Sequence, residues 1–441
     1  MSGTEYDKAS SVSERRAWYM YDFANSAFPT TVVTLFLGPY LTALARSAAG
    51  ASGYVYPFGV KIDARSYWSY LISLSVLSQV VCLPVVGALA DSSPNKKRLL
   101  GFFAYLGAAT TAAMFWLADG QYLLGGLLFL AANLAFGASV VIYNSFLNDI
   151  APPQQRDAAS ATGWGIGYLG GGLLLGLNLL LYTNAGRWGL DEALAVRISL
   201  GSAGLWWALF TLFPMRGLRR RVRTQQAALA AHVWWRGFVQ FYSTLRDLRR
   251  YPQAVTFLLA YLLYNDAVQA VITLAGQFGA DYLGMPMELL TMAILMVQFL
   301  AFGWAMLFKV LAARLGGYRS LVTGLVVWTA LMGGVFWVQS ARDFFIAAAV
   351  VALVMGGTQA LSRSLFSVLI PQGREAEYFS LYEISDKGTS WLAPLLFGLT
   401  LQATGSYQWA ILSLLVFFVL GLFVIGRVDM QQGAREAGNL P

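Results

Sequence analysis

Repeated apolar stretches long enough to cross a lipid bilayer dominate this sequence. A helix needs about 20 apolar residues to cross the hydrocarbon core. With only 12% charged residues, the chain has about half the charge density of a soluble domain, which excludes a water-soluble globular enzyme. We predict an all-α integral membrane protein with twelve transmembrane helices, at 18–45, 67–90, 98–117, 121–147, 157–182, 196–214, 253–280, 287–313, 319–338, 343–370, 376–402 and 406–427.

Single copies of two residue types exclude several kinds of chemistry. Cys82 is the only cysteine, so no disulfide can form within the chain, and His232 is the only histidine, so no site can use two imidazoles. The sequence also lacks the GxxxxGK[ST] pattern of a phosphate-binding loop. We therefore expect no cofactor and no metal site.

The positive charge is concentrated in one segment. Residues 215–252 contain nine Arg and one acidic residue, and the rest of the chain has 21 basic and 21 acidic residues. We interpret this segment as a cytoplasmic linker that lies on anionic lipid, and we expect no nucleic-acid partner. Basic residues in the short loops gather on the side of both termini, which predicts cytoplasmic termini. No signal peptide is expected before the first span.

An internal repeat indicates two halves. Residues 150–157 (IAPPQQRD) resemble residues 369–375 (LIPQGRE) at a displacement of 218, and the two opening helices carry Asp22/Asn25 and Asp266/Gln269 at a displacement of 244. Two parallel six-helix halves around a midplane site are an architecture of secondary transporters. The expected regions are a tail at 1–17, halves at 18–214 and 253–427, the linker at 215–252 and a tail at 428–441.

Four motifs carry a family resemblance. Residues 87–98 (GALADSSPNKKR) resemble the loop signature of the major facilitator superfamily, whereas the second-half copy at 309–316 (KVLAARLG) lacks the acid. Residues 18–28 (WYMYDFANSAF), 160–171 (SATGWGIGYLGG) and 356–366 (GGTQALSRSLF) are similar to the vacuole-effluxer family of that superfamily. The family is named for a fungal autophagy-related exporter of amino acids from the vacuole. The resemblance implies a major facilitator fold and, from the chain length, a bacterial cytoplasmic membrane protein.

Ionisable residues within spans are the main candidates for substrate binding or coupling, because a charge at the centre of a helix costs about 2.5–3.5 kcal/mol. Asp266, with Asn265 and Gln269, is expected to bind a proton or a substrate amine, or else to pair permanently with a basic residue. Asp22, with Asn25, is expected to form a gate or coupling site, or else to complement the N-terminal dipole of its own helix.

Helix 343–370 carries a further candidate group on one face. Arg363 follows Gln359 by four residues. Its guanidinium is suited to a substrate carboxylate, or else to neutralising Asp22 or Glu383. Tyr168 is an aromatic candidate for stacking on a substrate, and the glycines around it predict close helix packing.

The ends of the helices supply candidate gate residues. Asp91 is expected to lock the cytoplasmic helix ends together in one state and release them in the other, as the family resemblance implies. Glu383 and Lys387 are spaced to neutralise each other. The full set of gate candidates is Asp91, Lys96, Arg98, Asn148, Asp149, Arg156, Arg374, Glu383 and Lys387.

The predicted function is secondary active transport of a small polar solute, with an amino acid as the expected substrate and a proton as the candidate coupling ion. The expected assembly is a monomer. The main alternative is an efflux permease for amphipathic drugs or lipids, which the Trp and Phe content favours. A membrane enzyme is disfavoured because His232 lies outside every span, and a transport-inactive sensor is disfavoured by the charged residues inside the spans.

Overall fold

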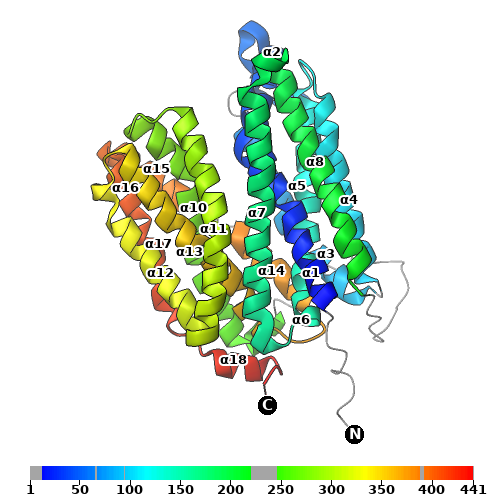
Figure 1. Ribbon diagram of the computed structural model, residues 1–441, viewed down its shortest axis with the longest axis vertical. Helices are drawn as coiled ribbons and strands as arrows, with labels where there is room; N and C mark the ends of the chain where they lie inside the picture. Colours follow the sequence, from blue (N-terminus) through cyan, green and yellow to red (C-terminus); the bar gives the residue numbers. More distant parts are fainter. Residues whose placement is uncertain (1–11, 65–66, 94, 220–245, 388–391, 441) are drawn as a thin grey trace.

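The fold is a bundle of long helices in two groups (Figure 1). The computed structural model describes residues 12–64, 67–93, 95–219, 246–387 and 392–440. The first group consists of α1 (Val12–Asn25), the π-helix η1 (Phe28–Phe36), α2 (Leu37–Ala49), α3 (Tyr67–Ser92), α4 (Lys96–Ala113), α5 (Tyr122–Ser145), α6 (Leu147–Ile150), α7 (Arg156–Thr183) and α8 (Glu192–Gly217).

The second group begins after the linker. It consists of α10 (Pro252–Gln277), the π-helix η9 (Phe278–Tyr282), α11 (Met287–Leu315), α12 (Gly317–Gly333), α13 (Ala341–Val368), α14 (Glu375–Lys387), α15 (Leu392–Thr404), α16 (Tyr407–Ser413), α17 (Leu415–Ile425) and α18 (Met430–Glu436). Short 3₁₀ turns occur at 50–52, 57–59, 114–116, 153–155, 185–188, 248–250 and 335–337. The strands β1 (Tyr54–Val55) and β2 (Ile62–Asp63) pair antiparallel, with Tyr54 opposite Asp63.

The predicted spans coincide with these helices, with one difference in length. Among the described residues, ten helical segments are long and apolar enough to cross a membrane. The predicted span at 319–338 forms the 17-residue helix α12. The predicted span at 376–402 covers α14 and α15, and residues 388–391 between them lie outside the described part of the chain. The 13-residue helix α14 carries three glutamates and is too short to cross a bilayer by itself.

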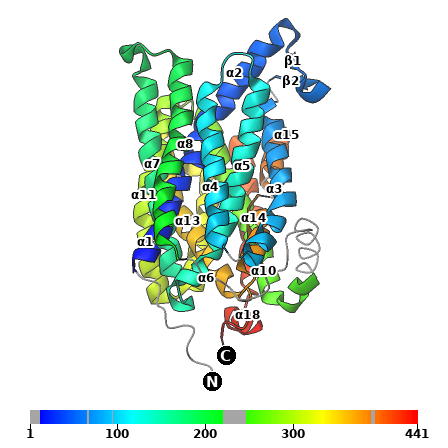
Figure 2. The same cartoon turned by 90° about the vertical axis from the view of Figure 1, so that its right-hand side faces the viewer.

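The start of α1 and the helix α18 lie at the same end of the bundle, and α2 lies at the other (Figure 2). We name the first the terminal end and the second the distal end. The end of α8 and the start of α10, which flank the linker, also belong to the terminal end, because each long helix reverses the direction of the one before it. Most of the linker, together with His232 and the segment expected to contact lipid, lies outside the described residues.

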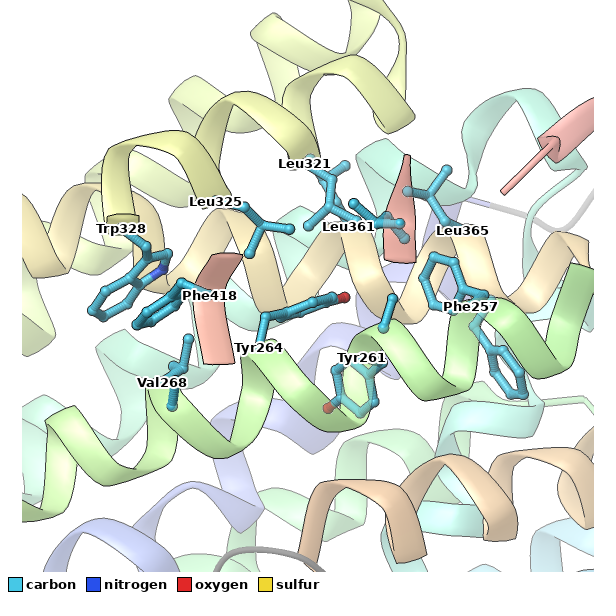
Figure 3. Packing of buried hydrophobic residues seen from close by; sticks show 14 of the residues in the cluster. Phe257, Tyr261, Tyr264, Val268, Leu321, Leu325, Trp328, Leu361, Leu365 and Phe418 are labelled. Atoms are coloured by element: carbon cyan, nitrogen blue, oxygen red, sulfur yellow. The ribbon is translucent and has the colours of Figure 1, made fainter. Parts of the chain in front are cut away.

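The second half has a continuous aromatic and aliphatic core (Figure 3). Phe257, Tyr261, Tyr264 and Val268 recur at a spacing of three or four along α10, so they share one helix face. Tyr264 donates or accepts a 2.6 Å hydrogen bond with Ser362 on α13. This face therefore fixes α10 against α13, which carries the candidate residues Gln359 and Arg363.

Glycines allow α7 to approach helices of both halves. A Cβ atom at Gly165 would lie 2.6 Å from Cε of Met306 on α11, and one at Gly170 would meet the backbone of Phe23 on α1. Close packing through small residues is typical of membrane helices. The glycine-rich segment of α7 thus lies between the first helix and the second half, and it positions Tyr168.

Candidate functional site

A buried ion pair joins the two halves through α1 and α13. Arg363 Nη1 lies 3.5 Å from Oδ2 of Asp22, and the two side chains are 4% and 14% exposed. The hydroxyl of Tyr143 on α5 donates a 2.6 Å hydrogen bond to the same carboxylate oxygen. Asp22 is therefore neutralised by a residue of the opposite half.

The remaining donors of Arg363 are also engaged. Nε donates to Ser160 Oγ at 2.8 Å, Nη2 donates to the Ser160 carbonyl at 2.9 Å, and Nη1 donates to Asn144 Oδ1 at 3.2 Å. The guanidinium lies 5.0, 5.7 and 5.6 Å from the ring centroids of Trp18, Tyr143 and Trp164. In this conformation Arg363 binds protein groups, so it offers little to the carboxylate of a substrate.

We call this group the central lock, defined by Asp22, Tyr143, Asn144, Ser160 and Arg363. Its members come from α1, α5, α7 and α13, so it can form only when these helices of the two halves are together. A buried pair held by additional hydrogen bonds is strongly weakened when one partner is removed. The central lock is therefore an arrangement that stabilises one relative position of the halves.

A second contact between the halves joins α7 and α13. The Tyr168 hydroxyl on α7 donates a 2.5 Å hydrogen bond to Oε1 of Gln359 on α13. Ser160 Oγ also donates to the Ala360 carbonyl at 2.7 Å. Tyr168 and Gln359, predicted as separate substrate candidates, thus contact each other across the interface.

Asp266 has a different environment. Its side chain is 1% exposed, and Oδ2 accepts a 3.0 Å hydrogen bond from the backbone N–H of Ala393 in the first turn of α15. Its Oδ1 is buried and has no hydrogen-bond partner among the described residues. The carboxylate is therefore attached to the start of a helix segment and keeps one unsatisfied oxygen inside the membrane span.

The residues predicted to accompany these two acids lie nearby in sequence but differ in exposure. Asn25 and Asn265 are buried, and Gln269 is half-buried. Asp22 contacts α5 and α13, whereas Asp266 contacts α15. The described contacts do not bring the two acids to a shared partner.

Asp91 contacts the opposite half at the terminal end. Its two carboxylate oxygens accept hydrogen bonds from the N–H groups of Ala376 and Glu377 at 3.1 and 2.8 Å. These groups lie in the first turn of α14, where N–H groups lack partners within the helix. A Cβ atom at Gly87 would lie 2.6 Å from the Ala376 carbonyl oxygen, so glycine permits this close approach. We call this contact the Asp91 latch.

Three other gate candidates, Arg156, Asn148 and Glu383, also form contacts across the interface. Arg156 Nη1 donates to the Ser367 carbonyl at 2.8 Å, and Asn148 Nδ2 donates to the same carbonyl at 3.4 Å. Asn144 Nδ2 donates to Glu383 Oε1 at 3.0 Å. Glu383 was expected to pair with Lys387, whose side chain lies outside the described atoms.

The remaining gate candidates act within one half or face solvent. Lys96 Nζ lies 3.5 Å from Asp149 Oδ2 in the first half, and Arg98 is exposed. Arg374 Nη1 donates to Asp247 at the end of the linker at 2.9 Å, and it also bonds Glu377. The hydrogen bond from Arg374 holds the pKa of the Asp247 carboxyl below its usual value.

Sequence reasoning did not select three residues of the interface as candidates: Tyr143, Ser160 and Asp157. Tyr143 and Ser160 are neutral residues within spans, and only their position in the fold shows that they bind the charged pair. Asp157 follows Arg156 in the internal repeat, and that repeat was the available signal. Among the described residues, no group of three or more His, Cys, Asp or Glu side chains is arranged to hold a metal ion.

Comparison with known proteins agrees with this architecture. The family model described as "Vacuole effluxer Atg22 like" matches residues 10–438. An uncharacterised MFS-type transporter, YxiO, from Bacillus subtilis is 30% identical over 97% of this chain and 98% of its own length. Autophagy-related protein 22 from Yarrowia lipolytica is 27% identical over 86% of this chain and 78% of its own length.

Solved structures show the same fold. The crystal structure of the human organic anion transporter MFSD10 (TETRAN) superimposes with a TM-score of 0.67 at 15% identity, over 94% of this chain and 99% of that one. The relative from Bacillus subtilis is named as a transporter, and the helices described above are those of an integral membrane protein. Because the family model spans nearly the whole chain, the protein belongs to the Atg22-like vacuole effluxer family of major facilitator superfamily transporters.

Proposed function

We propose that this transporter moves a small polar solute, an amino acid, across the bacterial cytoplasmic membrane by alternating access. Both termini and the Arg-rich linker are on the cytoplasmic side, so the terminal end faces the cytoplasm. The protein acts as a monomer, and its linker contacts anionic lipid. The basic residues in the loops of this side support the orientation, and the family description supports export.

The observation that carries the proposal is the position of the polar contacts between the halves. The central lock, the Asp91 latch and the bonds of Arg156 and Asn148 to Ser367 all lie on the segments that approach the terminal end. They hold the cytoplasmic ends of the halves together. The conformation described here is accordingly the one closed to the cytoplasm.

Transport requires that these contacts break and form again. In the closed conformation the charge of Asp22 is balanced by Arg363 of the other half. When the halves separate at the terminal end, both groups need new partners, and these are water or the polar ends of an amino acid. An amino acid carries a carboxylate for Arg363 and an ammonium for Asp22, so its chemistry matches the separated pair.

Asp266 is the proposed proton site. Its Oδ1 is buried and unsatisfied, and a proton on this oxygen removes the cost of an isolated charge inside the span. Oδ2 meanwhile keeps its bond to the N–H of Ala393. The carboxyl can therefore gain and lose a proton while it remains attached to α15.

The experiment uses the purified protein in lipid vesicles and measures counterflow of labelled amino acids with and without a pH gradient. Wild-type protein is expected to show both counterflow and gradient-driven accumulation. Asp266→Asn is expected to lose accumulation and retain counterflow. The matched control is Asp119→Asn, an exposed acid in a loop of the distal end.

Two results would contradict the proposal in different ways. Unchanged accumulation by Asp266→Asn would remove this residue from proton coupling. Movement of hydrophobic cations without exchange of any amino acid would replace the polar substrate with the amphipathic substrates of a drug or lipid permease.

A further inference from the structure

We propose that Asp157 forms a second latch between the halves at the terminal end, in place of the acid that the second-half loop lacks. The geometry of the contact stands without any assumption about the substrate. Its role as a gate rests on the proposed alternating-access function.

The first latch shows what such a contact needs. Asp91 extends from the end of α3 to the N–H groups that begin α14 in the other half. The related segment of the second half, residues 309–316, lies at the end of α11, directly before α12. Alignment of the two loop sequences places Ala313 where the first has Asp91. The loop of the second half therefore cannot provide a carboxylate at this position.

The first half supplies an acid for this contact instead. Asp157 lies in the first turn of α7, and its Oδ1 accepts a 2.5 Å hydrogen bond from Ser364 Oγ on α13. Its Oδ2 lies against Gly317, the first residue of α12, so closely that a Cβ atom there would clash with it. Asp157 thus contacts two helices of the other half.

Both contacts suit a carboxylate. At the start of the 17-residue helix α12 the first N–H groups have no partner within the helix, and the positive end of the helix dipole lies there. A hydroxyl that donates to an ionised carboxylate forms a stronger bond than one between neutral groups. Separation of the halves at this end would remove Asp157 from α12 and from Ser364 together.

The internal repeat shows that the two latches are built in opposite ways. At the displacement of 218, Asp157 corresponds to Glu375 at the start of α14. Glu375 Oε1 accepts a 3.0 Å bond from the Gly373 N–H of its own turn, and Asp91 occupies the start of that helix instead. One latch therefore takes its acid from the end of α3, and the other takes it from the start of the facing helix α7.

The test measures the separation of the halves by electron paramagnetic resonance. Cys82 is the only native cysteine, so spin labels at Arg16→Cys and Arg314→Cys in a Cys82→Ser background report on one distance. Both positions are exposed, and they lie at the terminal end of opposite halves. We call these labelled sites the reporter pair.

Asp157→Asn and Gly317→Ala are each expected to raise the ratio of long to short distances by about tenfold, the effect of one lost charge-assisted bond. The first removes the charge, and the second places a methyl group where the carboxylate lies. The controls are Asp119→Asn and Gly333→Ala. Gly333 ends the same helix α12 and has open space around its Cβ direction.

Unchanged distances in both Asp157→Asn and Gly317→Ala would overturn the second latch, provided that Asp91→Asn shifts the same reporter pair. An equal shift in Gly333→Ala would overturn it as well, since any added methyl group would then have the same effect. These distances need no substrate. If no solute is transported but Asp157→Asn opens the terminal end, the proposed function fails and the latch remains.

Discussion

Replacement of Arg363 by glutamine is expected to open the terminal end more strongly than any other single change in the central lock. The substitution removes the cation and leaves the Asp22 carboxylate buried, with the Tyr143 hydroxyl as its remaining donor. It also removes hydrogen bonds to Ser160 and Asn144 of the first half. The contacts of Arg363 join the two halves, so they are lost when the halves separate.

The size of the effect follows from the burial of the pair. The Arg363 and Asp22 side chains are 4% and 14% exposed, and removal of one partner from a buried pair costs about 3–5 kcal/mol. Since about 1.4 kcal/mol is a factor of ten, the closed population should fall by at least two orders of magnitude relative to the open one. The reporter pair should then show mainly long distances.

Asp22→Asn should have a smaller effect. Arg363 then keeps its acceptors on Ser160 and Asn144 and the three aromatic rings around the guanidinium. The double variant Asp22→Asn/Arg363→Gln should be less open than Arg363→Gln alone, because no unpaired carboxylate remains. The matched control is Arg342→Gln, an exposed arginine at the distal end of the same helix α13.

The reasoning fails if Arg363→Gln leaves the distance distribution of a folded protein unchanged. It also fails if the free energy of opening in the double variant changes by the sum of the changes in the two single variants, since the two residues would then act independently. Thermal unfolding of each variant, followed in detergent, establishes that the compared proteins are folded.

Three further changes test other contacts. Gly87→Ala places a Cβ atom 2.6 Å from a backbone carbonyl oxygen of α14 and should shift the reporter pair to longer distances, whereas Gly398→Ala, with open space around it, should not. Tyr168→Phe leaves the buried Oε1 of Gln359 without its 2.5 Å bond and should reduce the closed population by about fivefold to a hundredfold, in the same measurement. Asp247, whose pKa is lowered by its arginine partner, should stabilise the fold above the unfolded-state pKa of about 3.9; the difference in unfolding temperature between wild type and Asp247→Asn should therefore disappear as the pH falls below the folded-state pKa, and a constant difference would contradict the pairing.

Hydrophobic length predicted the helices well because the bilayer imposes it on every span. Residues 376–402 combine the polar helix α14 with the apolar helix α15, and residues 388–391 between them lie outside the described part of the chain. Periodicity in sequence also placed Gln359 and Arg363 on one face of α13, and both contact α7.

The partners of these residues could not be predicted from the sequence. Arg363 had two acceptable kinds of partner, and the choice of Asp22 depends on how α1 and α13 approach each other. Ser160 was hidden for a related reason: its hydroxyl and carbonyl serve an arginine 203 positions away in the chain. Contacts between helices that are distant in sequence leave no local pattern.

The opposite construction of the two latches limits which segments related transporters can exchange. A graft that introduced Ala313→Asp would make the repeat more regular, but it would add a negative charge four residues before Gly317, at the start of the helix that Asp157 already contacts. Like charges at one helix start repel each other. A graft of this kind should succeed only when Asp157 of α7 is replaced in the same step. Positions 157 and 313 must therefore be exchanged together, although they are 156 positions apart in the chain.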